Sequence, residues 1–365
     1  MVNATALVNF GNGTGLEIGD WTYSTYLRSA PNYLPLNNAS TSYLQASYPA
    51  LVALLPTQFK MFLTSNTTVT FPAAVQWYTV AYGGGVWVAG SYTTGDTARS
   101  TNNAATWSAG GANIGSSRGM AYGAGLFFST SGGTSHSSSP DGVTWTTRTT
   151  PVSVTGVAFG GGIFAAVGSN AACSSTDGIT WTTRTIPTGD WGAITYGGGL
   201  FVAIDRTGGA GVTTVVTSPD GINWTSRSLP NAVVCYSITY GNGIFLLIPS
   251  TSTTVYTSPD GITWTNRTST NHGNSAYVTF GDGVFGAYAS STLYISTDGI
   301  TWALTSASPF TGSGNIGYGT GGVFVAVNNA NNVTNLRFIA AISTTNFYLP
   351  VVTPVTGTFT YIRAT

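Results

Sequence analysis

A glycine-rich turn between two aromatic residues occurs seven times in this 365-residue chain, at intervals of about forty residues. In six copies the second aromatic residue follows five positions after the first. The copies begin at Tyr82, Tyr122, Phe159, Tyr196, Tyr240, Phe280 and Tyr318. A repeat of this length is typical of architectures in which each copy is one supersecondary unit. The chain is therefore expected to fold as a repeat protein.

A second motif, Ser-x-Asp-Gly-x-x-Trp, lies between successive glycine-rich turns. Its aspartates are Asp141, Asp177, Asp220, Asp260 and Asp298. An Asp side chain accepts hydrogen bonds from amides of its own turn, Gly supplies a positive φ, and the Trp restarts a strand. A weaker copy that starts at Ser100 lacks both the Asp and the Gly. We interpret these aspartates as structural residues of the turns.

The residues around each glycine-rich turn have the pattern of two short strands that pack face to face. Two further strands follow in each repeat, one on either side of the Asp turn. Four short antiparallel strands in about forty residues form one blade of a β-propeller. The Asp turns resemble the Asp-box repeats of sialidase-like propellers, although the motif here is one residue shorter. This resemblance implies an architecture and no particular chemistry.

The ring of blades is expected to close through the N-terminal side of the chain. The segment from Asn66 to Pro72 matches the outer-strand pattern of other repeats, but it has no inner strands of its own. The seventh repeat has the opposite defect, because no Asp turn and no Trp follow its inner strands. An open sheet edge is a weak point and an aggregation hazard. Residues 65–71 are therefore predicted to supply the outer strand of a seventh blade, whose other strands come from residues 314–344.

The segments outside the propeller resemble the tail-collar and tail-fibre proteins of phages. From Gly19 there follow a Gly-Asp strand, an Ala-Pro loop, a Leu-x-Leu-Asn strand and a Tyr-Pro-Ala-Leu helix, and the chain ends in Tyr-Ile-Arg-Ala. The resemblance implies a small base domain of residues 1–63 and 346–365, with a helix at about residues 47–55 and three-fold assembly. The propeller, residues 64–345, is inserted in it. The expected fold is thus an all-β, seven-bladed β-propeller of four-stranded antiparallel blades, inserted in a small α+β collar-like base domain.

The composition argues against several classes of partner. Only 6% of the residues are charged, and the 11 basic residues are balanced by 11 acidic ones. Such a chain has little electrostatic attraction for nucleic acid or for an anionic membrane. It also has no apolar run of eighteen residues and no secretory signal at its N-terminus. We expect no nucleic-acid partner and no membrane insertion, and synthesis in the host cytoplasm.

No catalytic, metal or cofactor site is expected. His136 and His272 lie in different repeats without a second ligand at metal-binding spacing, and the one glutamate, Glu17, lies outside the propeller. The chain is therefore predicted not to be an enzyme. A glycoside hydrolase of sialidase-like fold is the alternative, because a carboxylate pair such as Asp190 and Asp205 would serve that chemistry at a suitable separation.

Loop lengths indicate where a ligand binds. The Asp and the Trp of each Asp turn keep a constant spacing, whereas the interval from the second aromatic residue to the Asp varies from 13 to 19 residues. Recognition is commonly built on connections that packing does not constrain. The candidate binding residues on these connections are Tyr92, His136, Asp190, Trp191, Asp205, Arg206 and His272. Trp191 is a candidate for stacking on a sugar, or else, like Trp77 in the same register, packs at a strand start.

Together these features predict a structural protein of a phage virion, in the tail, tail fibre or baseplate. Its propeller would bind a host-surface receptor, a glycan or a protein, through the variable loops. The base domain would bind other virion proteins and form a homo-oligomer, which the resemblance implies to be a trimer. An architectural protein of the capsid or particle surface, without receptor binding, is a further alternative.

Overall fold

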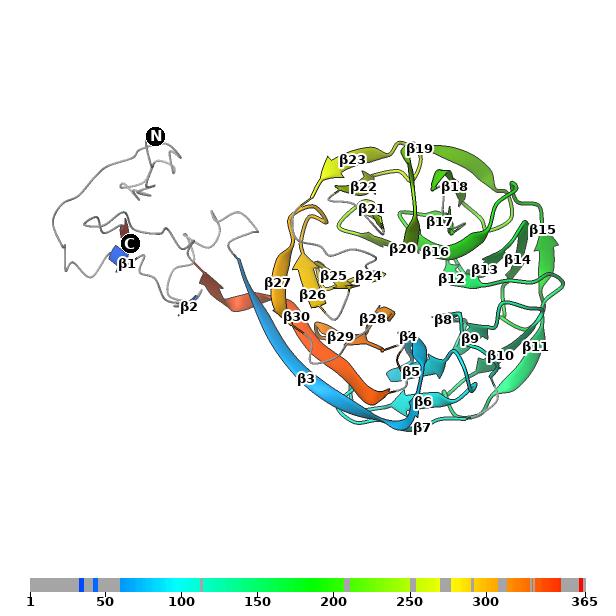
Figure 1. Cartoon of the computed structure of the whole chain (residues 1–365), viewed down its shortest axis with the longest axis horizontal. Helices are drawn as coiled ribbons and strands as arrows, with labels where there is room; N and C mark the ends of the chain where they lie inside the picture. The colour runs from blue at the N-terminus through cyan, green and yellow to red at the C-terminus, as the bar shows by residue number, and fades with distance from the viewer. Residues whose placement is uncertain are drawn as a thin grey trace. The chain divides into compact units, whose positions relative to one another are not determined.

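The computed structural model describes residues 33–35, 42–44, 60–111, 114–206, 211–249, 254–269, 277–289, 292–307, 314–328, 330, 332–348 and 361–363. The chain divides into two compact units. One unit consists of residues 64–341, and the other combines residues 1–63 with residues 342–365. The larger unit is a ring of antiparallel β-sheets around a central channel (Figure 1).

Six of the sheets in the ring are blades of four consecutive antiparallel strands. Each blade runs outward from the channel in chain order, which is the simplest pairing for strands joined by short turns. The blades are β4 (Trp77–Gly83), β5 (Val86–Ser91), β6 (Thr97–Ser100), β7 (Ser108–Ala109); β8 (Gly119–Gly123), β9 (Leu126–Thr130), β10 (Ser135–Ser139), β11 (Thr146–Thr149); β12 (Gly156–Gly160), β13 (Ile163–Gly168), β14 (Ala171–Ser175), β15 (Thr182–Arg184); β16 (Trp191–Gly197), β17 (Leu200–Asp205), β18 (Val212–Ser218), β19 (Thr225–Val233); β20 (Cys235–Gly241), β21 (Ile244–Pro249), β22 (Thr254–Ser258), β23 (Thr265–Thr268); and β24 (Tyr277–Gly281), β25 (Val284–Ala289), β26 (Thr292–Ser296), β27 (Ala303–Ala307).

Each glycine-rich turn joins the two inner strands of a blade. In the hairpin of β12 and β13, Phe159 pairs with Phe164 across the sheet, and their rings lie 4.7 Å apart. The two residues between the strands, Gly161 and Gly162, have φ angles of 57° and 81°. Two successive positive φ angles are the signature of the tight turn whose twist matches a hairpin, and glycine adopts them without strain.

The same turns also lock neighbouring blades together. The aromatic residue that opens one turn packs flat against the first glycine of the preceding turn, so that a Cβ atom on Gly160 would lie 2.0 Å from Cγ of Tyr196. Gly83, Gly123, Gly197, Gly241 and Gly281 have equally close aromatic neighbours. The pairing of an aromatic residue with glycine in every repeat thus has a packing reason, since only glycine leaves room for the ring.

The Asp turns join the two outer strands of a blade through one hydrogen-bond pattern. Oδ1 of Asp177 accepts bonds from the amides of Ile179 and Thr180, each 2.8 Å long, and one from the hydroxyl of Ser175. These amides, first that of Thr180, lower the pKa of the Asp177 carboxyl to about 2. The other four Asp turns repeat the pattern.

In the weaker first copy of the turn, Asn102 takes the place of the Asp, and the amide that it binds lies four positions on instead of two and three. The side-chain oxygen of Asn102 accepts hydrogen bonds from the amide of Thr106 and from the hydroxyl of Ser100, at 3.0 and 2.9 Å. An amide oxygen can therefore take the place of the carboxylate in this turn.

The last sheet differs from the six blades, and here the predicted fold class was wrong. It is five-stranded: β28 (Ile316–Tyr318), β29 (Val323–Ala326) and β30 (Asn332–Tyr348) pair in order, and β3 (Lys60–Val75) and β2 (Ser42–Leu44) both pair with β30. The propeller therefore has six four-stranded blades rather than seven. The reason is the missing Asp turn, because without it β30 continues for 17 residues and gains neighbours from the N-terminal part of the chain.

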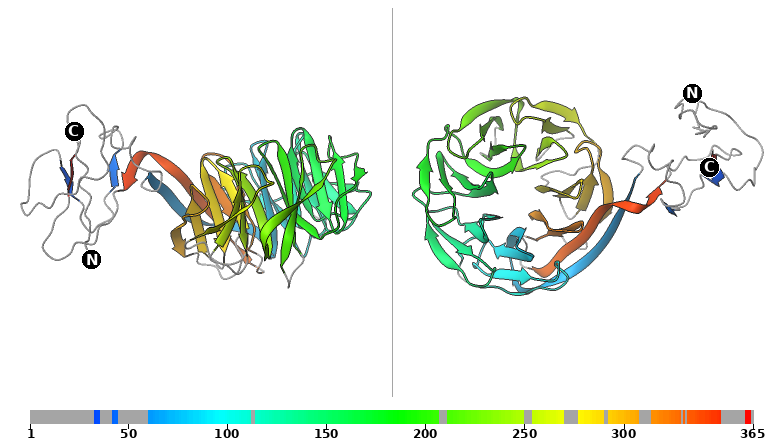
Figure 2. Two further views of the ribbon diagram at one scale, coloured as in Figure 1. Left: turned by 90° about the horizontal axis from the view of Figure 1, so that it is seen from above. Right: turned by 180° about the vertical axis from the view of Figure 1, so that it is seen from behind.

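This closing sheet ties the ring (Figures 1 and 2). Its inner strand β28 contacts β4 of the first blade, and β3 lies outermost, beside β30. Val69 and Phe71 of β3 share a buried core with Trp77 and Trp87 of the first blade and with Val325 of β29. This core holds the two ends of the ring together.

In the smaller unit, the N-terminal and C-terminal segments pair with each other. β1 (Tyr33–Pro35) is antiparallel to β31 (Tyr361–Arg363), and β2 is antiparallel to the end of β30. The described residues of the whole chain contain no helix, so an α+β base domain was a wrong expectation for this part. The helix expected at about residues 47–55 lies outside the described residues. Within the described part, no helix is long and apolar enough to cross a membrane.

Candidate binding pocket at the channel mouth

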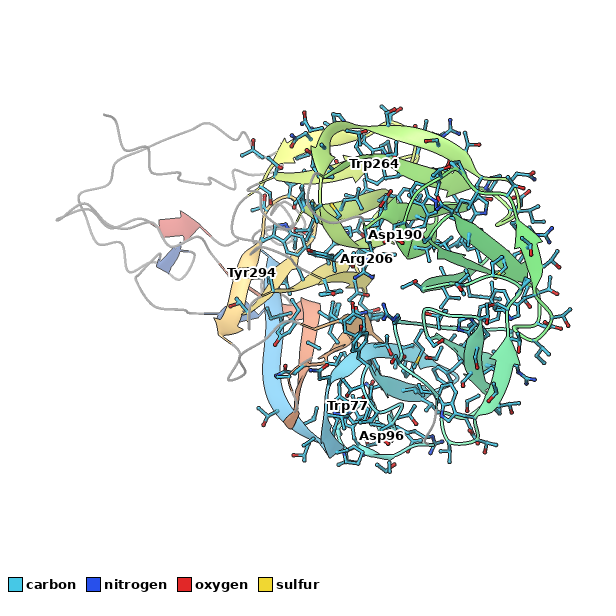
Figure 3. The ribbon with its side chains drawn as sticks, turned by 45° about the vertical axis from the view of Figure 1, so that its right-hand side comes forward. Trp77, Asp96, Asp190, Arg206, Trp264 and Tyr294 are labelled. Atoms are coloured by element: carbon cyan, nitrogen blue, oxygen red, sulfur yellow. The ribbon has the colours of Figure 1, made fainter. Side chains whose placement is uncertain are left out.

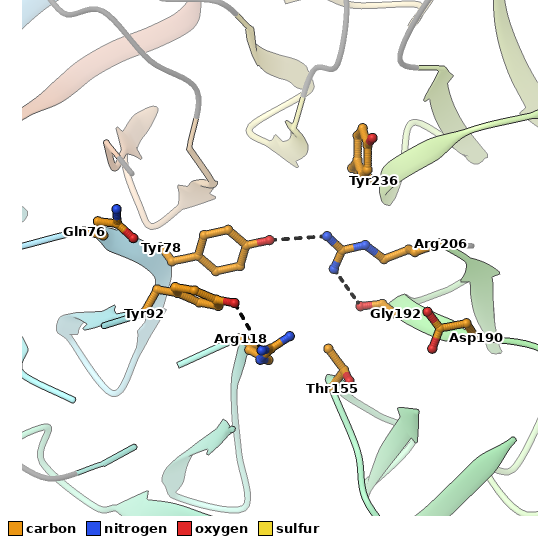
Figure 4. A pocket seen from close by; sticks show the side chains of 9 residues that line it. All are labelled: Gln76, Tyr78, Tyr92, Arg118, Thr155, Asp190, Gly192, Arg206 and Tyr236. Atoms are coloured by element: carbon orange, nitrogen blue, oxygen red, sulfur yellow. Dashed lines mark hydrogen bonds between the residues drawn. The ribbon is translucent and has the colours of Figure 1, made fainter. Parts of the chain in front are cut away.

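A cavity of about 470 Å³ opens where the inner strands begin, at the end of the channel opposite the glycine-rich turns. Nine residues line it (Figure 4): Gln76, Tyr78, Tyr92, Arg118, Thr155, Asp190, Gly192, Arg206 and Tyr236. Seven of them lie in the first strands of five successive blades or directly before those strands. The other two, Tyr92 and Arg206, directly follow the second strands β5 and β17. The pocket therefore lies on the face that carries the connections of variable length. A second cavity, of about 330 Å³, is lined by the inner strands and shares residues with the first.

Five of these residues occupy one register position in the repeat. Tyr78, Arg118, Thr155, Gly192 and Tyr236 each lie four residues before the aromatic residue that opens a glycine-rich turn. We call these five the pocket positions. Because each inner strand runs from this face to its glycine-rich turn, the repeat brings equivalent positions together around the channel mouth. The side chains there are of four different types among the five repeats, although the turns that follow are nearly constant.

Tyr78 extends from the first blade to two blades elsewhere in the ring. Its hydroxyl accepts a hydrogen bond of 3.3 Å from Nη2 of Arg206 and lies 3.1 Å from the hydroxyl of Tyr277. Nη1 of Arg206 donates to the carbonyl of Gly192 at 3.3 Å, and the backbone amide of Arg206 donates to the carbonyl of Asp190. Figure 4 shows Tyr78 and Arg206 pointing toward each other, and Figure 3 places Asp190 beside Arg206. Tyr78 thus forms part of the floor of the pocket.

A second arginine and tyrosine form a similar pair. Nη2 of Arg118 donates to the hydroxyl of Tyr92 at 3.1 Å, and its guanidinium lies 5.1 Å from the centre of that ring. The ring of Tyr92 is in turn 5.4 Å from the ring of Tyr78. The guanidinium of Arg206 lies 5.8 Å from the centre of the Tyr236 ring. Both arginines are therefore held over aromatic faces, which is a favourable arrangement for a cation.

The two arginines make the potential in the pocket positive. Burial raises the pKa of the Tyr78 phenol, but the charges of Arg206 and Arg118 and the hydrogen bonds to the phenol outweigh burial, so that this pKa is lowered. Burial raises the pKa of Tyr277, and the neighbouring Tyr78 raises it further. Burial alone would lower the pKa of Arg206, yet Tyr78, Tyr277 and Asp190 together raise it, and Arg206 stays charged.

Three of the candidate residues line this pocket. Tyr92, Asp190 and Arg206 converge there from three connections, and Asp190 is exposed. Asp205 is 7% exposed and does not line the pocket. Asp190 is the single carboxylate among the lining residues. Hydrolysis by a pair of carboxyl groups needs both at the substrate, and this pocket does not provide them.

Trp191, the candidate for stacking on a sugar, is buried. Trp191 is 1% exposed and donates its indole N–H to the carbonyl of Pro187, as Trp77 does to the carbonyl of Ala73. An indole with so little exposure has no face on which a sugar can stack, and both tryptophans pack at strand starts. His272 lies outside the described residues.

His136 is also part of the interior. Its Nδ1 accepts a hydrogen bond from the amide of Ser131, and its Nε2 lies 2.9 Å from the hydroxyl of Thr150. Burial lowers the pKa of His136 to about 4. The imidazole is therefore neutral at pH 7 and holds a loop in place.

Sequence reasoning missed Tyr78, Arg118 and Tyr236. The signal that would have found them is the register position, because each lies four residues before the aromatic residue that opens a glycine-rich turn. Among the described residues, no group of His, Cys, Asp or Glu side chains is placed to hold a metal ion. Cys173 and Cys235 are buried free thiols, and burial raises the pKa of each to about 12.

Comparison with known proteins agrees with the fold. A family profile described as the DUF6242 beta propeller domain matches residues 184–308. No curated protein matches the chain. Among solved structures, a streptogramin B lyase is 11% identical with a TM-score of 0.63, and the alignment covers 76% of this chain and 98% of that one. A virginiamycin B lyase from Staphylococcus aureus is 9% identical with a TM-score of 0.64 over 76% and 99%.

A third solved structure, YCF48 bound to a D1 peptide, is 11% identical with a TM-score of 0.60, over 75% of this chain and 96% of that one. Identities this low carry the fold and not the chemistry. The chain therefore shares a β-propeller fold with these proteins.

Proposed function

We propose that this chain is a structural protein of a phage virion, in the tail, tail fibre or baseplate, and that its propeller binds a receptor on the host surface. The observation that carries the binding part is the pocket at the channel mouth. The pocket positions carry Tyr, Arg, Thr, Gly and Tyr in successive repeats, while the turns of the same repeats are nearly identical. Because the blade itself does not need these side chains, their variety favours a role in recognition.

The strand pairing within the smaller unit supports the proposed role in the virion. β1 pairs with β31 and β2 with the end of β30, so segments from both ends of the chain fold together. This is the arrangement of a small domain into which a propeller is inserted. Together with the sequence resemblance to tail-collar and tail-fibre proteins, it favours a base that binds other virion proteins and forms a homo-oligomer, a trimer by that resemblance. The protein would then be located in the virion and would act without catalysis.

Binding of the purified, full-length protein to a glycan array and to intact bacteria tests the proposal. Two pocket variants, Arg118→Gln and Tyr92→Ala, are compared with Arg148→Gln. Arg148 lies on an outer strand, where its Nε bonds to the hydroxyl of Ser138. We expect the pocket variants to lose most of the binding and the control to keep it.

Equal binding by all three variants would refute the pocket as the receptor site. Imaging of assembled particles with an antibody to the propeller tests the virion location. A label on the capsid, or a channel mouth covered by a neighbouring subunit, would favour the architectural alternative instead.

A further inference from the structure

We infer that the pocket binds a sugar that carries a negative charge, with Arg118 and Arg206 as the groups that hold the anion. The inference rests on the proposed binding function of this pocket and adds the chemical class of its ligand.

The side chains that line the pocket carry a net positive charge. Two guanidiniums and one carboxylate, that of Asp190, line a pocket in a chain whose formal net charge is zero. The hydrogen-bond partners of the two guanidiniums are the hydroxyls of Tyr92 and Tyr78 and the carbonyl of Gly192, all of them uncharged. The positive charge in the pocket is therefore larger than its own side chains neutralise.

Most N–H groups of the two guanidiniums have no hydrogen-bond partner among the described residues. A guanidinium carries five N–H groups. The hydrogen bonds of Arg118 to Tyr92, and of Arg206 to Gly192 and Tyr78, occupy three of the ten. These hydrogen bonds, which Figure 4 shows, and the rings of Tyr92 and Tyr236 hold both groups in place. An anion that enters the pocket meets donors that are already oriented, so less side-chain entropy is lost on binding.

The rest of the pocket lining is polar or aromatic and suits a sugar. The lining contains three tyrosines, Gln76, Thr155 and Asp190, but no aliphatic hydrophobic side chain. Such a lining suits a body with many hydroxyl groups, which can donate to Asp190 and accept from Gln76, and not a hydrocarbon ligand. Its volume of about 470 Å³ lies within the usual range for small-ligand pockets. The same two arginines lower the pKa of the Tyr78 phenol against the effect of burial.

The test uses the full-length chain and a glycan panel with four arms: sugars with a carboxylate, sugars with a phosphate, neutral sugars of matched size, and acidic peptides. We expect the carboxylate or the phosphate arm to bind at least tenfold more tightly than the neutral arm. The two charged arms identify the source of the negative group. Because Arg118 is exposed, binding should weaken as the salt concentration rises.

Variants locate the interaction. Arg118→Gln should weaken binding of the best acidic sugar about tenfold or more, roughly the effect of one charge-assisted hydrogen bond. Arg118→Lys should retain part of it, because the charge stays and the planar fork is lost. Arg148→Gln is the control. Arg206→Gln should act in the same direction, and the thermal midpoint of each variant shows whether it remains folded, since Arg206 also bonds to Gly192.

Each result decides a different claim. Acidic hits that Arg118→Gln weakens support the inference. Neutral sugars or acidic peptides as the tightest ligands, still lost on Tyr92→Ala, would overturn the anionic-sugar class while the binding function stands. No ligand in any arm, together with unchanged binding of the pocket variants to bacteria, would overturn both.

Discussion

The contact between Gly160 and Tyr196 allows a quantitative test of how the blades are held together. The change is Gly160→Ala, which adds one methyl group where two blades meet. Gly160 does not have a positive φ, so alanine brings no backbone strain. The added Cβ would lie 2.0 Å from Cγ of Tyr196, whereas ordinary contacts begin near 3.4 Å. The ring would have to move by about 1.4 Å, but it packs against Phe201 at 4.7 Å on its own blade.

We expect this change to destabilise the propeller by about 2–3 kcal/mol, the usual cost of forcing extra volume into a packed site. For a domain of this size that corresponds to a fall in the thermal midpoint of about 4–10 °C. Calorimetry or urea unfolding measures it. The matched control is Gly133→Ala: Gly133 has no positive φ, and its nearest neighbour would be 3.9 Å from the new Cβ. The control should change stability by less than about 1 kcal/mol.

A double-mutant cycle isolates the contact. Tyr196→Ala is destabilising by itself, but in its background Gly160→Ala should cost at least about 1 kcal/mol less than in the wild type. If Gly160→Ala and Gly133→Ala have the same effect, or if the cycle shows no coupling, the aromatic packing on glycine does not hold the blades together and the argument fails.

Three further predictions concern the turns and the interior. Asp177→Ala should cost about 1–2 kcal/mol because two amides lose their acceptor, and Asp177→Asn should cost less, because an amide oxygen can still accept hydrogen bonds from these amides. The pKa of Asp177 is about 2 in the folded protein, below its ordinary value of 3.8. Its contribution to the free energy of unfolding is therefore complete above about pH 4 and is lost as the pH falls toward 2. The lowered pKa of His136 affects stability in a separate pH range. The unfolded chain binds the proton more tightly than the folded protein does, so the free energy of unfolding should fall by up to about 3 kcal/mol between pH 6.5 and 4. Cys173 and Cys235 should react with a thiol reagent only after unfolding, because they are buried and their pKa values are about 12.

Urea midpoints at pH 7, 4.5 and 3 separate the two acid effects. His136→Gln should remove the loss between pH 6.5 and 4 and leave the loss below pH 4 intact, and an unchanged profile would contradict the buried, neutral imidazole. Asp177→Asn should flatten only the lower part of the profile. Rapid modification of either cysteine in the native protein would show that its blade opens without unfolding.

The glycine-rich turns show why the repeat could be recognised from the sequence. Two successive positive φ angles, as at Gly161 and Gly162, and a ring that packs on Gly160 can be satisfied by very few residue types. Local backbone geometry and contact with the adjacent repeat therefore leave a strict pattern in the sequence. The Asp turns leave a similar pattern, because their hydrogen bonds join residues at most three positions apart.

The closing sheet and the buried candidates show the limit of this reasoning. The repeat pattern predicted a seventh four-stranded blade closed by residues 65–71, but the closing sheet is five-stranded, so that count of blades was wrong. The length of β30 and its pairing with both β2 and β3 depend on contacts that lie outside the repeats. Loop position made His136 and Trp191 binding candidates, but both are buried, and Trp191 packs at a strand start like Trp77, which was the alternative for it. Whether a side chain in a connection is buried depends on neighbours from other elements, which the local sequence does not specify.

The sequence alone thus determined the repeating unit, its turns and the face on which its lengths vary, because each depends on contacts within one repeat or between adjacent ones. Only the tertiary structure decided which residues share the channel mouth. Tyr78 and Arg206 lie 128 residues apart, and they meet because the ring brings the first blade and the fourth to the same opening.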